Sequence, residues 1–384
     1  MAFGKKNVLS VDPCDYSLGL LGISGVGKTS TIKDYCEILA PQDGGYLFAE
    51  CGRESGADAI MGISYINCPD WNSDYDEINN SVGFKVLVDD IIQNKETEYP
   101  NLRLLVIDTY DQLIEIADNE ILRQYNKEAV AEGKPKAKSI KGAYGGFSRA
   151  EDMADDMAID MLWELKKVGV QFIIIGHVKN RDVTDAVTEQ TYTQLTTDMS
   201  MRSFNKIKNK IDVLGLAYID RSLIDVHKKK KANGEYVEVG KVSGETRKIS
   251  FRDDNYAIDS KSRFANIVSE IPLDGHALVD AITNAIKAEI ESKGSTVASV
   301  KKENAKADKA KVERAKQESK KARDSRVDAE KNEGLVTKIK ESFSNIDTGK
   351  RDAIMDYMKE HNIPSFKDVS EVPTSYLETI VGML

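Results

Sequence analysis

The sequence has few of the residues on which several common chemistries depend. Its 384 residues include four cysteines and four histidines, and no two cysteines have the C-x-x-C spacing of a zinc knuckle or a redox site. The G-x-S-x-G motif of many hydrolases does not occur. These absences argue against a disulfide framework, a cysteine-based metal centre and the usual protease and glycosidase chemistries. Reduced cysteines are typical of a cytoplasmic protein.

Long hydrophobic runs and an excess of basic residues are also missing. No window approaches the roughly 18 consecutive apolar residues of a membrane helix, and the first residues contain no apolar signal core. We therefore expect no membrane segment. Acidic residues outnumber basic ones by 63 to 54, which gives a net charge of −9. A protein that is basic overall is excluded, although local basic patches are not.

The first 290 or so residues alternate short apolar runs with amphipathic segments, a pattern typical of an α/β domain. Apolar residues at helical spacing predict helices within 32–39 and 154–168. The apolar runs predict strands at 18–22, 46–49, 102–107 and 170–175. The last two are expected to be buried on both faces.

Residues 213–252 predict an antiparallel extension at one edge of a parallel sheet. Three strands are expected at 213–219, 236–242 and 248–251, with hairpin turns at Asn233-Gly234 and Ser243-Gly244. The run His227–Lys231 precedes the first turn. It is suited either to holding a DNA backbone or to protecting an edge strand from aggregation.

The composition changes after residue 290. Residues 301–331 contain twelve Lys and Arg against seven Asp and Glu, with only Ala and Val as apolar residues. This predicts a solvated helix or a flexible tether, and apolar periodicity returns after Gly334. We expect an α/β domain over 1–290, a charged helical linker over 291–334 and a small helical domain over 335–384.

Residues 22–29, Gly-Ile-Ser-Gly-Val-Gly-Lys-Thr, match the phosphate-loop (Walker A) pattern G-x-x-x-x-G-K-[ST] without a mismatch. Glycines allow main-chain N–H groups to converge on phosphate oxygens, and the helix that follows adds its dipole. Lys28 would bind the β- and γ-phosphates, and the Thr29 hydroxyl would bind Mg²⁺. The residues expected to bind ATP are Gly22, Ile23, Ser24, Gly25, Val26, Gly27, Lys28, Thr29 and Ser30.

Three polar residues end predicted strands where they can act on the nucleotide. Asp108 follows Leu104–Ile107 and would orient the water shell of Mg²⁺ as the second metal ligand. Glu50 ends the next strand after the phosphate loop and would activate the attacking water as general base; the alternative is an exposed strand-end Glu. His177 ends the strand that starts at Gln171 and would sense the γ-phosphate, although a lone His is often structural.

The order of these parts resembles that of the RecA-like ATPases over roughly residues 15–285. Those proteins place a Glu, an Asp and a Gln or His at successive strand ends, as Glu50, Asp108 and His177 are placed here. Residues 144–149 and 176–179 are most similar to short phage ATPases, a group that includes RecA-like single-strand annealing proteins. The resemblance implies a RecA-like core, ATP hydrolysis and, for a phage-encoded protein, the host cell cytoplasm.

RecA-like recombinases contact DNA through two loops, which correspond here to residues 118–148 and 180–210. Each region has cations that can bind phosphates and aromatic rings that can stack on bases; ordinary surface loops are the alternative. The residues in the first are Arg123, Lys127, Lys134, Lys136, Lys138, Lys141, Tyr125 and Tyr144. Those in the second are Arg181, Arg202, Lys206, Lys208, Lys210, Tyr192 and Phe204.

Lys261-Ser-Arg263-Phe264 is similar to the Lys-x-Arg-Phe segments of RecA-like oligomers. The resemblance implies that Lys261 and Arg263 stabilise transition-state charge at a neighbouring subunit's nucleotide. It also implies a ring or filament of identical subunits. A surface basic pair is the alternative.

The leading hypothesis is an ATPase of phage recombination or replication that binds single-stranded DNA, for example to anneal strands. One alternative is a ring helicase or translocase on the same fold. Another is a non-catalytic switch, in which ATP binding only licenses assembly. The C-terminal region is expected to recruit a recombination or replication partner or to bind DNA itself.

Overall fold

The computed structural model describes residues 8–53, 56–184, 191–230, 236–251, 261–343, 346–361, 363 and 372–384. It divides into two compact units, Met1–Ala315 and Lys316–Leu384. The first unit contains a β-sheet covered by helices, and the second is helical in its described part. The turn predicted at Asn233-Gly234 lies outside the described residues.

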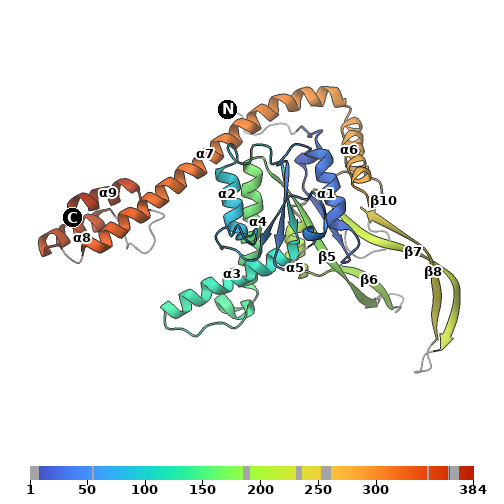
Figure 1. Ribbon diagram of the computed structural model, residues 1–384, viewed down its shortest axis with the longest axis horizontal. Coiled ribbons are helices and arrows are strands. Elements are labelled where there is room, and N and C mark those ends of the chain that lie inside the picture. Colours follow the sequence, from blue (N-terminus) through green and yellow to red (C-terminus); the bar gives the residue numbers. More distant parts are fainter. Residues whose placement is uncertain are drawn as a thin grey trace. The chain divides into compact units, whose positions relative to one another are not determined.

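A mixed β-sheet forms the centre of the first unit (Figure 1). Its path runs β10-β8-β7-β1-β5-β4-β2-β3, with β6 paired to β5 and β9 paired to β7. The pairs among β1, β2, β3, β4 and β5, and the pair β1–β7, are parallel, whereas β6, β8, β9 and β10 pair in antiparallel fashion. This confirms an α/β fold with a mostly parallel core and an antiparallel extension. The strands are β1 (Leu18–Gly22), β2 (Tyr46–Cys51), β3 (Tyr65–Cys68), β4 (Leu104–Asp108), β5 (Gln171–Thr184), β6 (Thr191–Thr197), β7 (Val213–Lys230), β8 (Tyr236–Ser250), β9 (Lys261–Ser262) and β10 (Glu270–Pro272).

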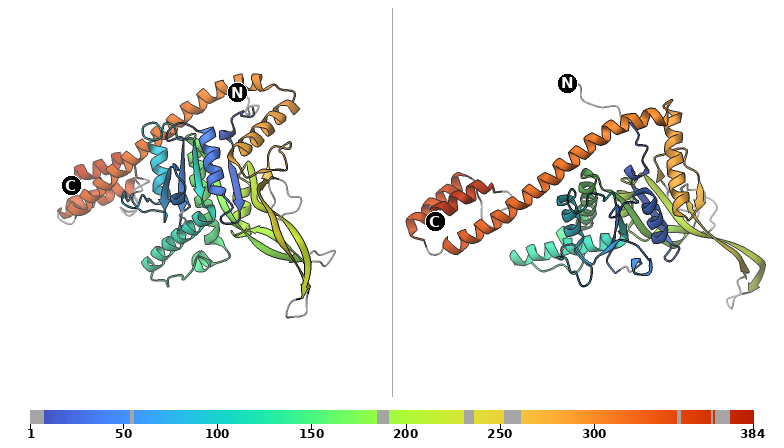
Figure 2. Two further views of the ribbon diagram at one scale, coloured as in Figure 1. Left: turned by 45° about the vertical axis from the view of Figure 1, so that its right-hand side comes forward. Right: turned by 45° about the horizontal axis from the view of Figure 1, so that its top comes forward.

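Helices cover both faces of this sheet (Figure 2). Along β4, Leu105 and Ile107 pack with α2, α3 and α4 on one face. Leu104 and Val106 pack with α1 and α6 on the other. This alternation explains why the strand is apolar at four consecutive positions. The helices are α1 (Lys28–Leu39), α2 (Phe84–Gln93), α3 (Tyr110–Ala131), α4 (Arg149–Lys167), α5 (Met201–Lys208), α6 (Gly275–Ser292) and α7 (Val297–Phe343), with short 3₁₀ helices η1 (Pro13–Asp15), η2 (Ala57–Ala59) and η3 (Ile140–Gly145).

Strands β7 and β8 continue beyond the sheet as a long two-stranded ribbon (Figure 1). The prediction of a hairpin turn at Ser243-Gly244 is wrong. β8 continues through these residues, because Gly244 pairs with Ser222 and Val242 pairs with Leu223. The intervening residue is an extra one on its strand, so the Ser-Gly pair marks a β-bulge.

The two regions expected to be loops contain regular structure. Helix α3 continues to Ala131, and Ile121 and Ala129 are buried in the part of it that was expected to be a loop. The second region forms the β5–β6 hairpin and α5. The irregular part of the first region is therefore limited to the segment between α3 and α4, which includes η3.

The first unit extends past residue 290, since Ile290 and Val300 belong to the same core as α1 and α6. The second unit contains the end of α7 together with α8 (Thr348–Glu360) and α9 (Thr374–Met383). Among the described helices, none combines the length and the hydrophobicity needed to span a membrane. The core of the second unit comprises Val336, Ile339, Ile354, Met358, Ile363, Val372, Leu377 and Ile380.

Candidate nucleotide-binding site

The phosphate loop connects the carboxyl end of β1 to the first turn of α1. Gly25 and Gly27 have φ values of +75° and +109°, which side chains rarely tolerate, and Gly27 is the N-cap of α1. The loop therefore presents main-chain amides and a helix N-terminus together, the arrangement that binds phosphate. Ser30 lies on the first turn of α1 and is exposed.

Gly22 is required for a different reason from the other two glycines. We expected it to allow a tight turn, but a Cβ atom at Gly22 would lie 2.6 Å from the carbonyl oxygen of Ala217. Gly22 and Ala217 are neighbours on the parallel strands β1 and β7. The close approach of these two strands, rather than the turn, excludes a side chain at this position.

Lys28 lies on the first turn of α1, and its side chain folds back over the loop. Its Nζ donates hydrogen bonds to the carbonyl oxygens of Gly22 and Ile23, at 3.1 and 3.0 Å. The residue is only 6% exposed. The ammonium group is thus held within the loop, where it can exchange these carbonyls for phosphate oxygens.

Thr29 and Asp108 meet at the edge of the sheet where the parallel strands end. The Thr29 hydroxyl donates a 2.7 Å hydrogen bond to Asp108 Oδ2. Hydroxyl and carboxylate oxygens are ligands that Mg²⁺ prefers, and this ion usually takes few protein ligands beside substrate phosphates. Among the described residues, no group of three or more His, Cys, Asp or Glu side chains could hold a metal ion. The pair therefore fits a Mg²⁺ that a nucleotide helps to bind.

Glu50 lies beside this pair because β2 and β4 are adjacent and Glu50 is paired in register with Asp108. It is 2% exposed, and its Oε1 accepts a 2.5 Å hydrogen bond from the Ala57 amide. A Cβ atom at Gly56 would lie 3.7 Å from Thr29 Oγ1 and 3.8 Å from Glu50 Oε1. The start of η2 thus covers both residues and fixes the Glu50 carboxylate at the site.

His177 follows Gly176 on β5 and is paired in register with Gly22. Its amide and its Nδ1 lie 3.2 and 3.1 Å from the two carboxylate oxygens of Asp111, on the first turn of α3. Its carbonyl oxygen accepts a hydrogen bond from the Asp198 amide after β6. Burial alone would raise the pKa of Asp111, but the hydrogen bonds from His177 hold it below its ordinary value.

Arg263 lies at the opposite edge of the sheet from the phosphate loop. Its Nε is 2.7 Å from Asp212 Oδ1, immediately before β7, and Phe264 is buried against Tyr16. The side chain of Lys261 lies outside the described residues. The roles of Lys261 and Arg263 at a neighbouring subunit therefore stay predictions.

Several cations and aromatic residues of the second predicted DNA loop are engaged inside the first unit. Lys206 contacts Asp152 and Asp156 at 3.0 and 2.9 Å, and Arg202 lies among acidic residues of α4. Phe204 is buried in the core. α5 packs these three residues against α4, and a DNA contact of this region stays a prediction. The side chains of Arg181 and Tyr192 lie outside the described residues.

Two residues at the site were not found from the sequence. Asp111 lies three residues after Asp108, which ends β4. Only the pairing of β4 with β5 shows that Asp111 reaches His177. Arg247 comes from β8, and its Nη1 donates a 3.1 Å hydrogen bond to the Val26 carbonyl in the phosphate loop. Neither contact has a local sequence signal, because each joins segments that are far apart in the chain.

The chain matches a known protein family over most of its first unit. A family model described as an AAA domain matches residues 15–264, which is well over half of the chain and includes the phosphate loop, Glu50, Asp108 and His177. No curated protein sequence matches the chain.

Proposed function

Because the chain belongs to the AAA domain family, we propose that this AAA-type P-loop protein hydrolyses ATP and that its nucleotide state controls binding to single-stranded DNA. The ATPase proposal depends on one observation. The phosphate loop, the Thr29–Asp108 pair and the buried Glu50 converge at one edge of the sheet. In this proposal one subunit contributes a phosphate loop, a metal-binding pair and a general base.

In this proposal each residue has a separate role. The loop amides and Lys28 would bind the triphosphate, and Thr29 and Asp108 would hold Mg²⁺, which would supply positive charge to stabilise the phosphates. Glu50 accepts a proton from the water that attacks the γ-phosphorus, while the bond to the bridging oxygen breaks and ADP leaves. Catalysis is then mainly positioning and electrostatic stabilisation.

The connection from His177 to Asp111 supports a link between the nucleotide and α3. His177 lies beside the end of β1, and Asp111 is on the first turn of α3. A γ-phosphate that attracts the imidazole would change its hydrogen bonds to Asp111. Such a change would act on a helix that extends 22 residues to the segment described next.

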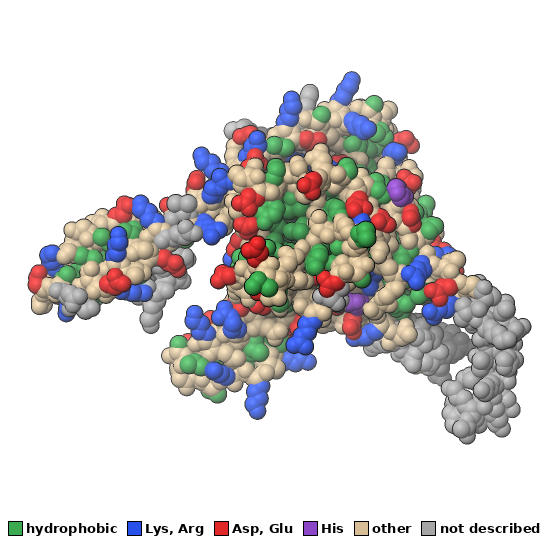
Figure 3. All heavy atoms as spheres, in the orientation of Figure 1, with side chains coloured by type: hydrophobic (Ala, Val, Ile, Leu, Met, Phe, Trp, Pro, Cys, Tyr) green, Lys and Arg blue, Asp and Glu red, His purple; other side chains and the backbone are tan. Residues whose placement is uncertain are grey.

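The segment between α3 and α4, residues 132–148, supports the proposal of a nucleic-acid partner. It contains four Lys and one acidic residue, Glu132, and Arg149 follows at the start of α4, in a chain of net charge −9. Lys136, Lys138, Lys141 and Arg149 are exposed. Figure 3 shows Lys and Arg side chains gathered around this protruding end of α3. Such a concentration of positive charge favours a polyanion.

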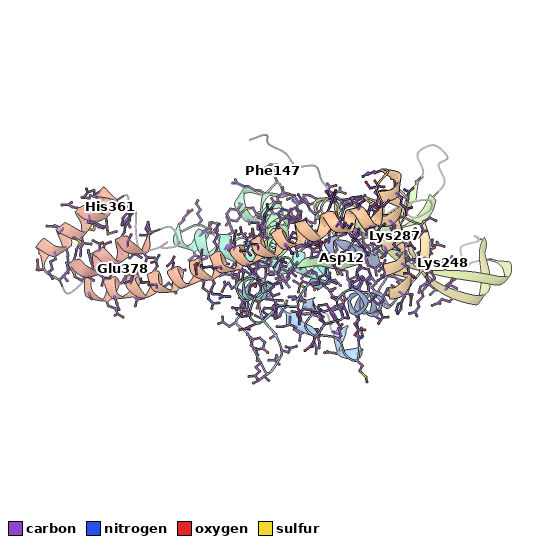
Figure 4. All side chains as sticks on the ribbon, turned by 90° about the horizontal axis from the view of Figure 1, so that it is seen from above. Asp12, Phe147, Lys248, Lys287, His361 and Glu378 are labelled. Atoms are coloured by element: carbon purple, nitrogen blue, oxygen red, sulfur yellow. The ribbon has the colours of Figure 1, made fainter. Side chains whose placement is uncertain are left out.

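The same segment presents one fully exposed aromatic ring. Phe147 is labelled in Figure 4, and its side chain is as accessible as in an extended peptide. Five consecutive residues, 144–148, have positive φ, and three of them are not glycine. Strained backbone of this kind clusters at functional sites. A ring held outward among cations can stack on an unpaired base, which favours single strands over duplexes.

We further propose a role in phage recombination or replication, as the resemblance to RecA-like annealing proteins implies. Subunits would assemble into a ring or filament in which Lys261 and Arg263 reach a neighbour's nucleotide. The second unit would recruit a partner protein. Annealing of complementary strands without unwinding by the purified protein would support this role, whereas unwinding of a forked duplex would favour a helicase.

The decisive experiment measures ATP turnover with and without single-stranded DNA at two salt concentrations. We expect DNA to stimulate turnover at low salt, and the stimulation to fade as salt rises because phosphate contacts weaken. Phe147→Ala should reduce the stimulation, Phe147→Tyr should retain it, and Lys287→Ala on α6 serves as a matched exposed control. Absence of stimulation at low salt would contradict the DNA proposal, and absence of turnover in every condition would favour the non-catalytic switch.

A further inference from the structure

Arg247 reaches the phosphate loop from β8, which is separated from β1 by β7. It lies on β8 opposite Ile219 of β7, and Ala217 of β7 is the neighbour of Gly22. Arg247 therefore lies level with a point two residues past the end of β1, beside the loop. Lys248, the next residue on β8, is labelled in Figure 4 and is held by Asp220 and Glu270 at 2.9 and 3.0 Å, which anchors this part of the strand.

The contact that Arg247 makes is directional. Its Nη1 donates a 3.1 Å hydrogen bond to the Val26 carbonyl oxygen. It also lies 3.6 Å from the position that a Cβ atom of Gly27 would occupy. The guanidinium is thus packed on the turn between Val26 and Gly27, at the point where α1 begins.

The geometry of the peptide bond links this contact to the direction of the Gly27 N–H. In a planar trans peptide the C=O of one residue and the N–H of the next point in opposite directions. When Arg247 holds the Val26 carbonyl toward β8, the Gly27 N–H must point away from β8. Gly27 has φ +109° and no side chain, so this peptide has conformational freedom that an external contact can remove.

We infer that Arg247 is a positioning residue for nucleotide binding: it fixes the Val26–Gly27 peptide so that the Gly27 N–H faces the phosphate. The inference rests on the proposed nucleotide site. The residue acts from outside the loop and is not a catalytic residue. Because the loop amides cradle the α- and β-phosphates, the contribution of Arg247 is the same for ATP and ADP.

This role predicts a particular kinetic signature. Removing Arg247 lowers the affinity of the substrate and of the transition state equally, so KM rises while kcat is unchanged. A variant that only destabilised the fold would lower the unfolding temperature without raising KM at constant kcat. Arg247→Lys keeps a donor and a charge but loses the planar fork, so it should recover part of the affinity.

The test compares four proteins: wild type, Arg247→Ala, Arg247→Lys and Arg221→Ala. Arg221 is the matched control because it lies on the same ribbon and shares a carboxylate partner with Arg247, Glu245. Titration with fluorescent ATP and ADP analogues should show about tenfold weaker binding of both nucleotides by Arg247→Ala, intermediate binding by Arg247→Lys and wild-type binding by Arg221→Ala. Steady-state ATPase assays should show a raised KM with kcat within about twofold of wild type.

Binding by Arg247→Ala within twofold of wild type would overturn the inference and leave the proposed function intact. An equal loss in Arg247→Ala and Arg221→Ala would also overturn it, because the effect would then come from the ribbon as a whole. If the wild-type protein bound neither nucleotide, the proposed function would fail and this inference would fail with it.

Discussion

Asp118 on α3 provides a quantitative test of the packing between α3 and α4. Its carboxylate faces Asp155 and Glu151 of α4, while Arg202 is the nearby cation. Burial and these like charges raise the pKa of Asp118 from 3.8 to about 6. We predict that Asp118→Asn stabilises the protein at neutral pH, because it removes a buried charge while keeping the shape of the side chain.

The sign and size follow from proton linkage. Between pH 4 and 6 the folded state binds a proton at Asp118 more tightly than the unfolded state does, so its contribution to stability falls as pH rises through this window. A difference of about two pH units corresponds to roughly 3 kcal/mol at pH 7.5. We expect about half of this, ~1.5 kcal/mol, because Asp118 is only partly buried and solvent screens its charge. At pH 5 the gain should be about half of its value at pH 7.5.

The assay is urea unfolding of wild type and Asp118→Asn at pH 5 and pH 7.5, followed by circular dichroism. Asp156→Asn is the matched control, since Asp156 is exposed on α4 and paired with Lys206 at 2.9 Å. Its effect should stay within about 0.5 kcal/mol. A gain from Asp118→Asn that is the same at both pH values, or no gain, would refute the explanation by a buried charge.

Two further predictions concern the site directly. Glu50→Gln should reduce kcat by about 10²–10⁴-fold and leave ATP binding within a few-fold of wild type. The amide keeps the shape of this buried side chain but cannot accept the proton. Single-turnover hydrolysis at the wild-type rate would show that Glu50 is not the general base. Gly22→Ala should lower the free energy of unfolding by about 1–3 kcal/mol, because its Cβ meets the Ala217 carbonyl at 2.6 Å. Thermal unfolding measures this, and Gly334→Ala, which has no atom within 4 Å of the new Cβ, should not destabilise the protein.

The core of the site was predictable because its signals are local. The phosphate loop is one continuous motif, and Glu50, Asp108 and His177 each end an apolar run. The carboxyl ends of parallel strands share one edge of a sheet, so residue type and position were sufficient to bring these side chains together. Their chemical roles stay predictions until they are tested by activity.

The remaining differences have two physical causes. Arg247 and Asp111 act through pairings between distant segments, which no local pattern reveals. The ion pairs of α5 were not predicted for another reason: Arg202 and Lys206 look available in the sequence, but α4 presents acidic residues to them. The burial of Phe204 was detectable, because Phe204 and Ile207 have the spacing of a buried helical face.

The Ser243-Gly244 pair illustrates an ambiguity that sequence alone leaves open. A Ser-Gly pair between apolar residues can end a strand or introduce one extra residue into it. Here the partner strand β7 continues on the opposite side, and a bulge results. The length of the neighbouring strand decided between the two outcomes.

The central claim is that the phosphate loop binds a triphosphate through its amides and Lys28. Calorimetric titration of Mg²⁺·ATP into wild type, Lys28→Ala and Lys33→Ala tests it most directly, since Lys33 lies on the same helix but pairs with Glu37 at 2.7 Å. We predict at least tenfold weaker binding by Lys28→Ala alone. Wild-type affinity in Lys28→Ala would contradict the claim.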